Sequence, residues 1–361
     1  MARLGRGAFL AAGLVGVAGS VPAGPPPAHD PMGSGATAVR RVVVAMGSPC
    51  ALEVSAPSRR EGLARLEMAI SAIEQVEARL SSWREDSELS RLNGATPGRR
   101  VAISGELAAD LARARELSDA TGGAFDPAIG RLVAAWDLRG AGRIPTAEAL
   151  RVARRGSGLD LLDIDLAART VRRRLPGATL DAGAFGKGVG IAAAARALEE
   201  GGATRWSLDL GGQIALHGGG HPPVAVADPR ARGRAAAWLD IEDVSAATSS
   251  NSERAKSVGH RSVGHILDPR TGTPAGFTGS VSVVSVDPVE ADALSTALFV
   301  MGPDDGMAWA TRQGRVQALF LIKEAHGLCA IWTPGLDGRV ELADGVNGRC
   351  PDVVADEPDD R

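Results

Sequence analysis

The chain contains no tyrosine, and aromatic residues make up only 3% of its 361 positions. Alanine, valine and leucine must therefore build most of the core. Hydrophobic residues reach 44% and charged residues 23%, an ordinary globular balance, and the length suits one large domain or two lobes. The net charge of -3 argues against a general nucleic-acid binder.

Cysteine and lysine are also scarce. The three cysteines are odd in number, which excludes a full disulfide framework, although Cys329 and Cys350 could pair in an oxidising compartment. The third, Cys50, suits a small apolar role beside Pro49, and none of the three has zinc-ligand spacing. Lysine occurs at three positions, Lys187, Lys256 and Lys323. Nearly all the positive charge is therefore arginine, and a lysine inside a glycine-rich segment, as at Lys187, becomes a candidate functional residue.

The N-terminus is typical of an export signal. Arg3 and Arg6 form a charged start, residues 8–21 are apolar or small, and residues 21–23 offer a small-residue cleavage site. The apolar run is too short for a comfortable membrane span, and no later segment resembles one. We therefore expect a signal peptide at residues 1–23 and an exported, periplasmic or cell-envelope protein. The alternatives are an uncleaved anchor and a wrongly assigned start of the chain.

Hydrophobic periodicity predicts the elements of the remaining chain. Residues 24–39 are a Pro- and Gly-rich linker with almost nothing to bury, and residues 41–55 indicate a β-hairpin. Apolar residues at steps of three or four indicate helices at 63–80 and from Ser104 to Gly122. Two further helices are expected at 188–200 and 289–301. The expected strands lie at 206–210, 224–227, 237–241, 281–286 and 318–322. This order predicts a mixed α/β, or α+β, domain at residues 40–335, helix-rich first and sheet-rich second, and a partly disordered segment at 336–361.

Asp292 and Thr296 lie four residues apart near the start of the helix expected at 289–301. Residues i and i+4 share a helix face, and the other residues of this helix are nearly all apolar, which is typical of a buried helix. Asp287 can cap the helix, and Glu290 falls three residues after the cap. A buried aspartate needs a partner, and hard oxygen ligands suit Mg²⁺, which completes its shell with phosphate and water. The alternative is a solvated helix edge.

A glycine-rich segment, Asp181–Gly188 (DAGAFGKG), follows a β-like stretch and opens an alanine-rich helix. Its glycines allow close backbone approach, free amides at a helix start attract phosphate, and Lys187 adds a point charge suited to a diphosphate. The spacing is not that of a Walker A loop. The alternative is a tight strand-to-helix turn.

His265 precedes residues 268–272 (DPRTG), which predict a turn that presents the histidine at the end of a short strand. A histidine can move protons near neutral pH, although a lone histidine is more often structural. Asp268 is the first residue of this turn and is expected to brace it.

Six segments, in order along the chain, resemble the signature blocks of the ApbE family of FAD:protein FMN transferases. They are MGSPC (46–50), SSWREDSELSRLN (81–93), TGGAFDPAIG (121–130), LDAGAFGKG (180–188), GHILDPRTG (264–272) and ADALSTALF (291–299). Weaker blocks lie at 207–212 and 247–250. The resemblance covers about residues 40–335 and implies an ApbE-like two-lobed fold, with antiparallel-rich sheets and packed helices.

The resemblance also implies roles for individual residues. Asp292, Thr296 and the backbone carbonyl of Ala184 would bind Mg²⁺, and His265, Lys187 and Asp292 would be catalytic. The implied FAD contacts are Met46, Trp83, Asn93, Ala124, Phe125, Asp126, Asp181, Lys187, Ser249 and Ile266. For Met46 and Trp83 the alternative is core packing, and for residues 122–127 it is a helix C-cap and turn. The chain departs from the family pattern at Ala184, Phe185 and Gly186, and Ser250 replaces a glycine.

The implied activity is Mg²⁺-dependent transfer of FMN from FAD to a Ser or Thr hydroxyl of an acceptor flavoprotein, with release of AMP. Two alternatives remain. The same site could hydrolyse FAD to FMN and AMP, as an FAD pyrophosphatase, or the chain could be a non-catalytic periplasmic FAD-binding protein. The implied partners are FAD and the acceptor, which could itself be membrane-bound; no nucleic acid and no integral membrane span of this chain are expected.

Overall fold

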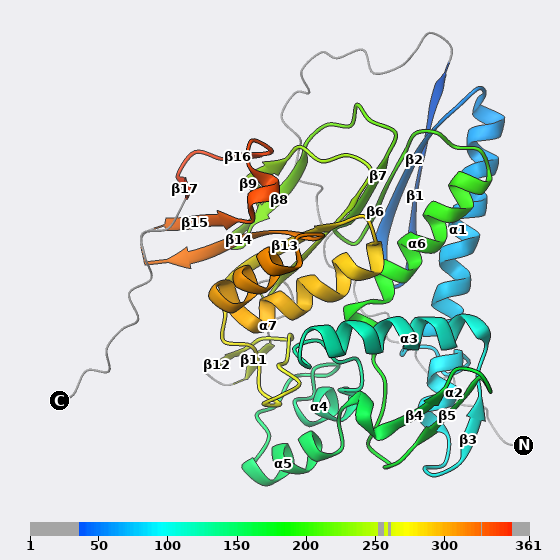
Figure 1. Ribbon diagram of the computed structural model, residues 1–361, viewed down its shortest axis with the longest axis vertical. Coiled ribbons are helices and arrows are strands. Elements are labelled where there is room, and N and C mark those ends of the chain that lie inside the picture. The colour runs from blue at the N-terminus through cyan, green and yellow to red at the C-terminus, as the bar shows by residue number, and fades with distance from the viewer. Residues whose placement is uncertain (1–35, 252–255, 259–260, 326, 349–361) are drawn as a thin grey trace, which may run out of the picture.

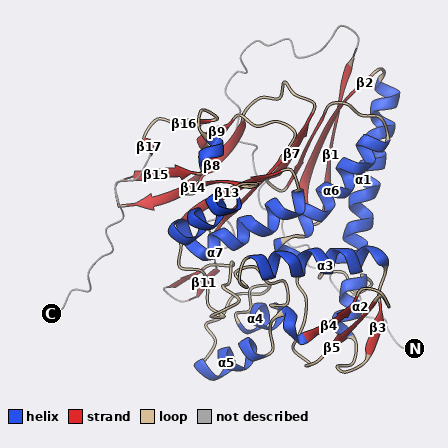
Figure 2. Cartoon of the chain, viewed as in Figure 1, coloured by secondary structure: helices blue, strands red, loops and turns tan. Residues whose placement is uncertain are grey.

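The computed structural model describes residues 36–251, 256–258, 261–325 and 327–348. A nine-stranded sheet forms the centre of the larger part of the protein, and three long helices cover one face of this sheet (Figures 1 and 2). A smaller, mainly helical part lies at one end of the molecule. The mixed α+β class expected from the sequence is confirmed. The expected leader at 1–23 and the last residues of the chain lie outside the described residues.

The large sheet is antiparallel except for its last pair, β15 with β17. In spatial order its strands are β1 (Thr37–Ala45), β2 (Ser48–Ala56), β6 (Trp206–Leu210), β7 (Gln213–His217), β10 (Ser245–Ser250), β13 (Gly279–Ser285), β14 (Gln317–Glu324), β15 (Gly327–Trp332) and β17 (Val346–Gly348). The expected hairpin is therefore confirmed as β1 and β2. The strand β1 begins at Thr37, so the expected domain boundary at residue 40 falls inside it.

Each face of the large sheet carries its own layer. Helices α1 (Arg59–Leu80), α6 (Gly186–Glu200) and α7 (Pro288–Gln313) contact one face. On the other face, buried residues of β8 (Val224–Asp228) and β9 (Ala231–Leu239) share a hydrophobic cluster with β13, β14 and β15, and half-buried residues of β16 (Val340–Leu342) pack against it. The expected strand at 237–241 marks only part of β9, because its first residue, Ala231, pairs with Asp228 of β8 but is exposed.

The smaller part holds short elements around α3. They are α2 (Glu88–Gly94), β3 (Arg100–Ala102), α3 (Gly105–Ala120), α4 (Gly130–Ala135), α5 (Ala147–Arg155), η1 (Leu159–Leu161), β4 (Leu162–Asp165), β5 (Thr170–Arg173) and η2 (Ala182–Ala184). The β11–β12 hairpin (Lys256–Val258, Arg261–Val263) packs against α4 and α5 in one hydrophobic cluster, and η3 (Pro334–Leu336) follows β15. Sequence periodicity missed most of them because they are only three to nine residues long. The segment expected to be partly disordered, 336–361, contains β16 and β17.

Helix α7 begins as the sequence predicts and then continues beyond the predicted end. The Asp287 carboxylate accepts a hydrogen bond from the Val289 amide at 2.9 Å and caps the helix. The expected end at Met301 is a kink, because Gly302 adopts φ 81° and Pro303 follows it. The second half of a capping box is not seen: buried Glu290 instead accepts hydrogen bonds from Ser285 and Arg315.

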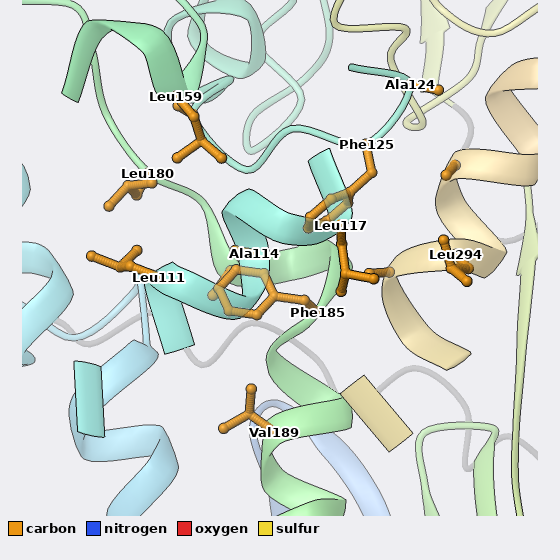
Figure 3. Packing of buried hydrophobic residues seen from close by; sticks show 14 of the residues in the cluster. Leu111, Ala114, Leu117, Ala124, Phe125, Leu159, Leu180, Phe185, Val189 and Leu294 are labelled. Carbon is orange, nitrogen blue, oxygen red and sulfur yellow. The ribbon is translucent and has the colours of Figure 1, made fainter. Parts of the chain in front are cut away.

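One hydrophobic cluster ties the two parts together beneath the glycine-rich segment (Figure 3). Phe125, from the loop between α3 and α4, packs edge-to-face on Phe185, with ring centroids 6.2 Å apart and an interplanar angle of 82°. Leu111 and Leu117 of α3 and Leu294 of α7 belong to the same cluster. The start of α6 therefore rests on a well-packed hydrophobic core.

The cysteines divide into one free thiol and one disulfide partner. Cys50 is free and fully buried, and Cys329 is disulfide-bonded; Cys350, the expected partner of Cys329, lies outside the described residues. Burial, together with the nearby Asp209 charge, raises the pKa of the Cys50 thiol to about 11. The apolar role expected for Cys50 agrees with this burial.

We expect the Cys50 thiol to be unreactive toward a disulfide reagent such as DTNB at pH 8 in the folded protein. A pKa of about 11 leaves almost no thiolate at this pH, and the side chain is fully buried. The coloured thiolate that DTNB releases on reaction should appear only after unfolding in guanidinium chloride, and it should be absent from a Cys50→Ser variant. Rapid labelling of the native protein would contradict the assignment of Cys50 to the core.

Among the described residues, no helix combines the length and the apolar composition that a bilayer span requires.

Candidate active site

The N-terminal turns of α6 and α7 lie in backbone contact because Gly188 has no side chain. A Cβ atom at Gly188 would lie 2.4 Å from the Pro288 carbonyl oxygen and 2.7 Å from the Cα atom of Val289. Both distances are shorter than real Cβ contacts, and both neighbouring atoms belong to the backbone. The two helix starts, which carry the predicted Lys187 and Asp292, are therefore brought together by this glycine.

Asp292 lies in this contact and is only 4% exposed. Its Oδ2 atom accepts a hydrogen bond from the Gly188 amide at 2.9 Å, and its Oδ1 atom lies 3.6 Å from Lys187 Nζ. The alternative of a solvated helix edge is thus wrong. An amide donor and a neighbouring cation are the partners that a buried carboxylate requires.

A row of hydroxyl groups continues from Asp292 along the same side of α7. Ser249, near the end of β10, places its Oγ atom 2.8 Å from Ser295 Oγ and 3.5 Å from Thr296 Oγ1. The Ser295 hydroxyl also donates to the Asp292 carbonyl oxygen at 2.9 Å. The structure thus brings predicted Ser249 and Thr296 together and adds Ser295, which the sequence did not single out.

The predicted metal ligands form a donor set that suits a hard cation. Among the residues that the structure describes, no group of three His, Cys, Asp or Glu side chains could hold a metal. The predicted set contains a single carboxylate, that of Asp292, together with the Thr296 hydroxyl and the Ala184 backbone carbonyl. Ala184 lies at the end of η2, which contacts α7. Mg²⁺ often keeps few protein ligands and takes phosphate and water for the rest. The residues therefore fit Mg²⁺.

A second carboxylate near Lys187 was not predicted. Asp209, in β6, accepts a hydrogen bond from the Gly212 amide at 2.9 Å across the β6–β7 turn. One side of the residue is open to solvent, but the packed atoms around the carboxyl raise its pKa, against the opposing effects of this hydrogen bond and of Lys187. Its position in the weaker family block at 207–212 (SLDLGG) was the available signal.

Asp181 connects the glycine-rich segment to a distant aromatic residue. Its Oδ1 atom caps η2 by accepting from the Gly183 amide at 2.8 Å, and its Oδ2 atom lies 2.6 Å from Arg139 Nη2. The Arg139 guanidinium lies over the Trp83 ring, 5.0 Å from the centroid. Trp83 is 75% exposed, so core packing is wrong for this residue. No sequence motif had indicated Arg139.

Met46 occupies the β1–β2 turn in a left-handed conformation, with φ 49°. Its amide donates to Glu77 Oε2 at 3.0 Å, which ties the turn to the end of α1. Its sulfur would lie 2.9 Å from a Cβ atom at Gly190, so Met46 packs closely on the first turns of α6. Core contact, the alternative for Met46, is therefore present.

Several other predicted FAD contacts are engaged within the protein. The Asn93 side chain donates to the Leu180 carbonyl oxygen and accepts from the Leu180 amide, both at 2.8 Å. Ala124 and Phe125 are fully buried, and their amides donate to the Thr121 carbonyl and hydroxyl oxygens. Asp126 accepts from the Ala128 and Leu159 amides, and burial raises the pKa of its carboxyl. These residues shape the segments that surround the site, and their contact with FAD stays a prediction.

His265 and Ile266 follow β12, as the sequence indicated. Ile266 is 7% exposed, and its amide donates to Asn251 Oδ1 at 3.1 Å. Asp268 braces the following turn: its side chain accepts from the Arg270 amide, and its carbonyl accepts from the Gly272 amide at 2.7 Å. The role of His265 as a base stays a prediction.

Comparison with known proteins gives a consistent result. The model of the ApbE family matches residues 46–320. A FAD:protein FMN transferase of Vibrio cholerae is 31% identical over 264 residues, which cover 71% of this chain and 78% of that protein. One of Rhodobacter capsulatus is 33% identical, with 98% of this chain and 66% of that protein covered.

Solved structures agree. The structure of "Flavin Transferase ApbE from Vibrio cholerae" has a TM-score of 0.74 and 27% identity, and covers 84% of this chain and 99% of that one. An ApbE protein of Thermotoga maritima has a TM-score of 0.76 over 84% of this chain and 99% of that one; at 24% identity it supports the fold alone.

Proposed function

The chain belongs to the ApbE family, and from that premise we propose that it transfers FMN from FAD to a Ser or Thr hydroxyl of an acceptor flavoprotein and releases AMP. The observation that carries the proposal is the buried carboxylate of Asp292, which the Gly188 amide and Lys187 hold at the joined N-termini of two helices. Helix N-termini and a lysine favour a diphosphate.

The residues of the chain have separable tasks in this reaction. Asp292, Thr296 and the Ala184 carbonyl would hold Mg²⁺, which when bound neutralises diphosphate charge and polarises the phosphorus centre. Lys187, whose side chain is 26% exposed, faces the same region and contributes a further positive charge. The glycine-rich turn offers backbone amides to the phosphate oxygens and leaves room for their approach.

The bond changes are those of a phosphoryl-type substitution. The acceptor hydroxyl oxygen forms a bond to the FMN phosphorus, and the bond from that phosphorus to the bridging oxygen breaks. The bridging oxygen leaves with AMP, and the hydroxyl proton passes to a base. We assign the base role to His265, because its position after β12 and before a braced turn gives it a fixed backbone.

We also propose that the chain acts outside the cytoplasm. The charged start, the apolar run at 8–21 and the small-residue site at 21–23 support export. The acceptors would then be flavin-bearing electron-transfer proteins of the cell envelope.

The test combines the purified full chain, FAD and a candidate acceptor, with and without Mg²⁺. We expect AMP release and a fluorescent acceptor band on a denaturing gel, both lost without Mg²⁺ and the band lost when the acceptor hydroxyl residue is replaced by Ala. AMP without a labelled acceptor, for every acceptor tried, would instead identify an FAD pyrophosphatase. FAD binding with no AMP under any condition would leave the non-catalytic FAD-binding protein.

A further inference from the structure

Arg139 is presented by a tightly closed loop between α4 and α5. The Gly140 and Gly142 amides both donate to the Asp137 carbonyl oxygen at 3.1 Å, and Asp137 itself adopts a left-handed φ of 50°. The Arg143 amide closes the loop by donating to the Trp136 carbonyl oxygen at 2.8 Å. The position of Arg139 is therefore set by backbone hydrogen bonds rather than by a free loop.

The Arg139 guanidinium joins two segments that are far apart in sequence. Its Nη1 and Nη2 atoms donate to the Ser82 carbonyl and hydroxyl oxygens at 3.1 and 2.8 Å. Its Nη2 atom also lies 2.6 Å from Asp181 Oδ2, while the plane of the group covers one face of Trp83. The planar, multidentate guanidinium can make all these contacts at once, which a lysine cannot.

Trp83 is covered by Arg139 on one face, but 75% of the residue is exposed. An exposed indole ring whose orientation is fixed from behind by a cation is a stacking surface for a planar aromatic group. FAD carries two such groups, the isoalloxazine and the adenine. The exposed ring is joined through Arg139 to the glycine-rich segment, where we place the diphosphate.

The same arginine controls the charge of that segment. Asp181 lies six residues before Lys187, and its side chain is only 18% exposed. An unpaired carboxylate here would repel the FAD diphosphate, because charges within a Debye length interact strongly when partly buried. The ion pair with Arg139 removes most of this repulsion.

We propose that Arg139 is a positioning residue for FAD, which fixes the Trp83 ring as a platform for one planar ring of FAD and neutralises Asp181 beside the diphosphate. This inference rests on the proposed function for the identity of the ligand. It concerns FAD binding only and includes no step of the transfer.

The test is a double-mutant cycle on FAD affinity. Dissociation constants are measured by flavin fluorescence, without acceptor, for the full chain and for Arg139→Ala, Trp83→Ala and the double variant. A cation–π pair of about 1 kcal/mol corresponds to about fivefold, so Arg139→Ala should weaken FAD binding by at least about fivefold. Because Arg139 acts partly through Trp83, the two effects should not be independent. The fold-increase in the FAD dissociation constant of the double variant should be at least about twofold smaller than the product of the two single fold-increases.

Two further readouts separate positioning from general stability. Arg139→Lys keeps the charge but loses the fork, so it should recover part of the affinity. FAD-induced quenching of tryptophan fluorescence should fall in Arg139→Ala to the level seen in Trp83→Phe. Repeating the titrations with FMN and with ADP identifies the stacked ring, since only the ligand that carries that ring should respond to Trp83→Ala.

Arg143→Ala is the matched control from the same loop. The Arg143 guanidinium donates to the Ala134 and Ala135 carbonyl oxygens, so its removal should lower the melting temperature and leave FAD affinity unchanged. Unchanged affinity in Arg139→Ala, strict additivity in the cycle, or an equal loss in Arg143→Ala would overturn the inference. If the wild-type chain binds FAD but transfers nothing, the proposed function fails while the cycle still decides the role of Arg139; if it binds no FAD, both fail.

Discussion

An Asp292→Asn variant should remain folded and lose about 1000-fold or more in the rate of Mg²⁺-dependent AMP release, the scale of removing a preorganised electrostatic group. The amide oxygen of asparagine can still accept the hydrogen bond that the Gly188 N–H donates to Asp292 at 2.9 Å. What is lost is the negative charge that faces Lys187 and that the proposed Mg²⁺ site requires. The measurement is AMP released per minute with saturating FAD and Mg²⁺, beside a melting curve.

Glu290→Gln supplies the matched control for this prediction. Glu290 is also a buried carboxylate on α7, 3% exposed, but it faces Arg315 and Ser285 instead of Lys187. Replacing it should lower the melting temperature, because Arg315 and Arg113 lose the buried negative charge that they face. It should leave the rate of AMP release per folded molecule close to that of the wild type. Equal losses of rate in the two variants would show that any change of charge in α7 is harmful and would remove the special role of Asp292.

A Gly188→Ala variant is expected to lose both stability and activity. The added methyl group would meet the Pro288 carbonyl oxygen at 2.4 Å, and a backbone atom cannot rotate out of its way. The helices must separate, so unfolding in urea should show a loss of about 1–3 kcal/mol, the usual scale of overpacking. Since the Gly188 amide would leave Asp292, the rate of AMP release by the remaining folded protein should fall by about 100-fold.

Gly233→Ala provides the comparison for the glycine prediction. A Cβ atom at Gly233 has no neighbouring atom within 4 Å, and the residue lies in β9 rather than at the site. This variant should match the wild type in activity and change the free energy of unfolding by less than 1 kcal/mol, as surface substitutions usually do. A stable and fully active Gly188→Ala variant would show that the two helix starts are not in rigid contact.

Local pattern was enough to predict the helix that carries Asp292 and Thr296. Their spacing placed both on one face, and the apolar residues around them indicated burial, which the structure confirms for Asp292. Local pattern could not show the partner of Asp292, because the Gly188 amide comes from another helix. Contacts of this kind depend on the tertiary fold and leave no periodic trace in the sequence.

Resemblance to family blocks placed residues near the site without separating ligand contacts from supporting ones. The Asn93 side chain donates one hydrogen bond to the Leu180 backbone and accepts another from it, and Phe125 packs on Phe185 in the core. Arg139 was missed for the opposite reason, since it lies outside every recognised block and matters through three-dimensional contacts with Ser82, Trp83 and Asp181. A short motif shows where a residue lies along the chain and in which local structure. Which residues contact the ligand and which support them depends on tertiary packing.

The hydrogen bond between Gly188 and Asp292 joins positions 104 residues apart in the chain. Closing a loop of this length costs conformational entropy, and the contact is gained only when the sheet and both helices have already docked. No fragment of the chain that ends before α7 can contain the site. Enzymatic activity should therefore return only with the last phase of refolding and should report complete folding of the larger part of the protein, whereas helical circular dichroism would recover earlier.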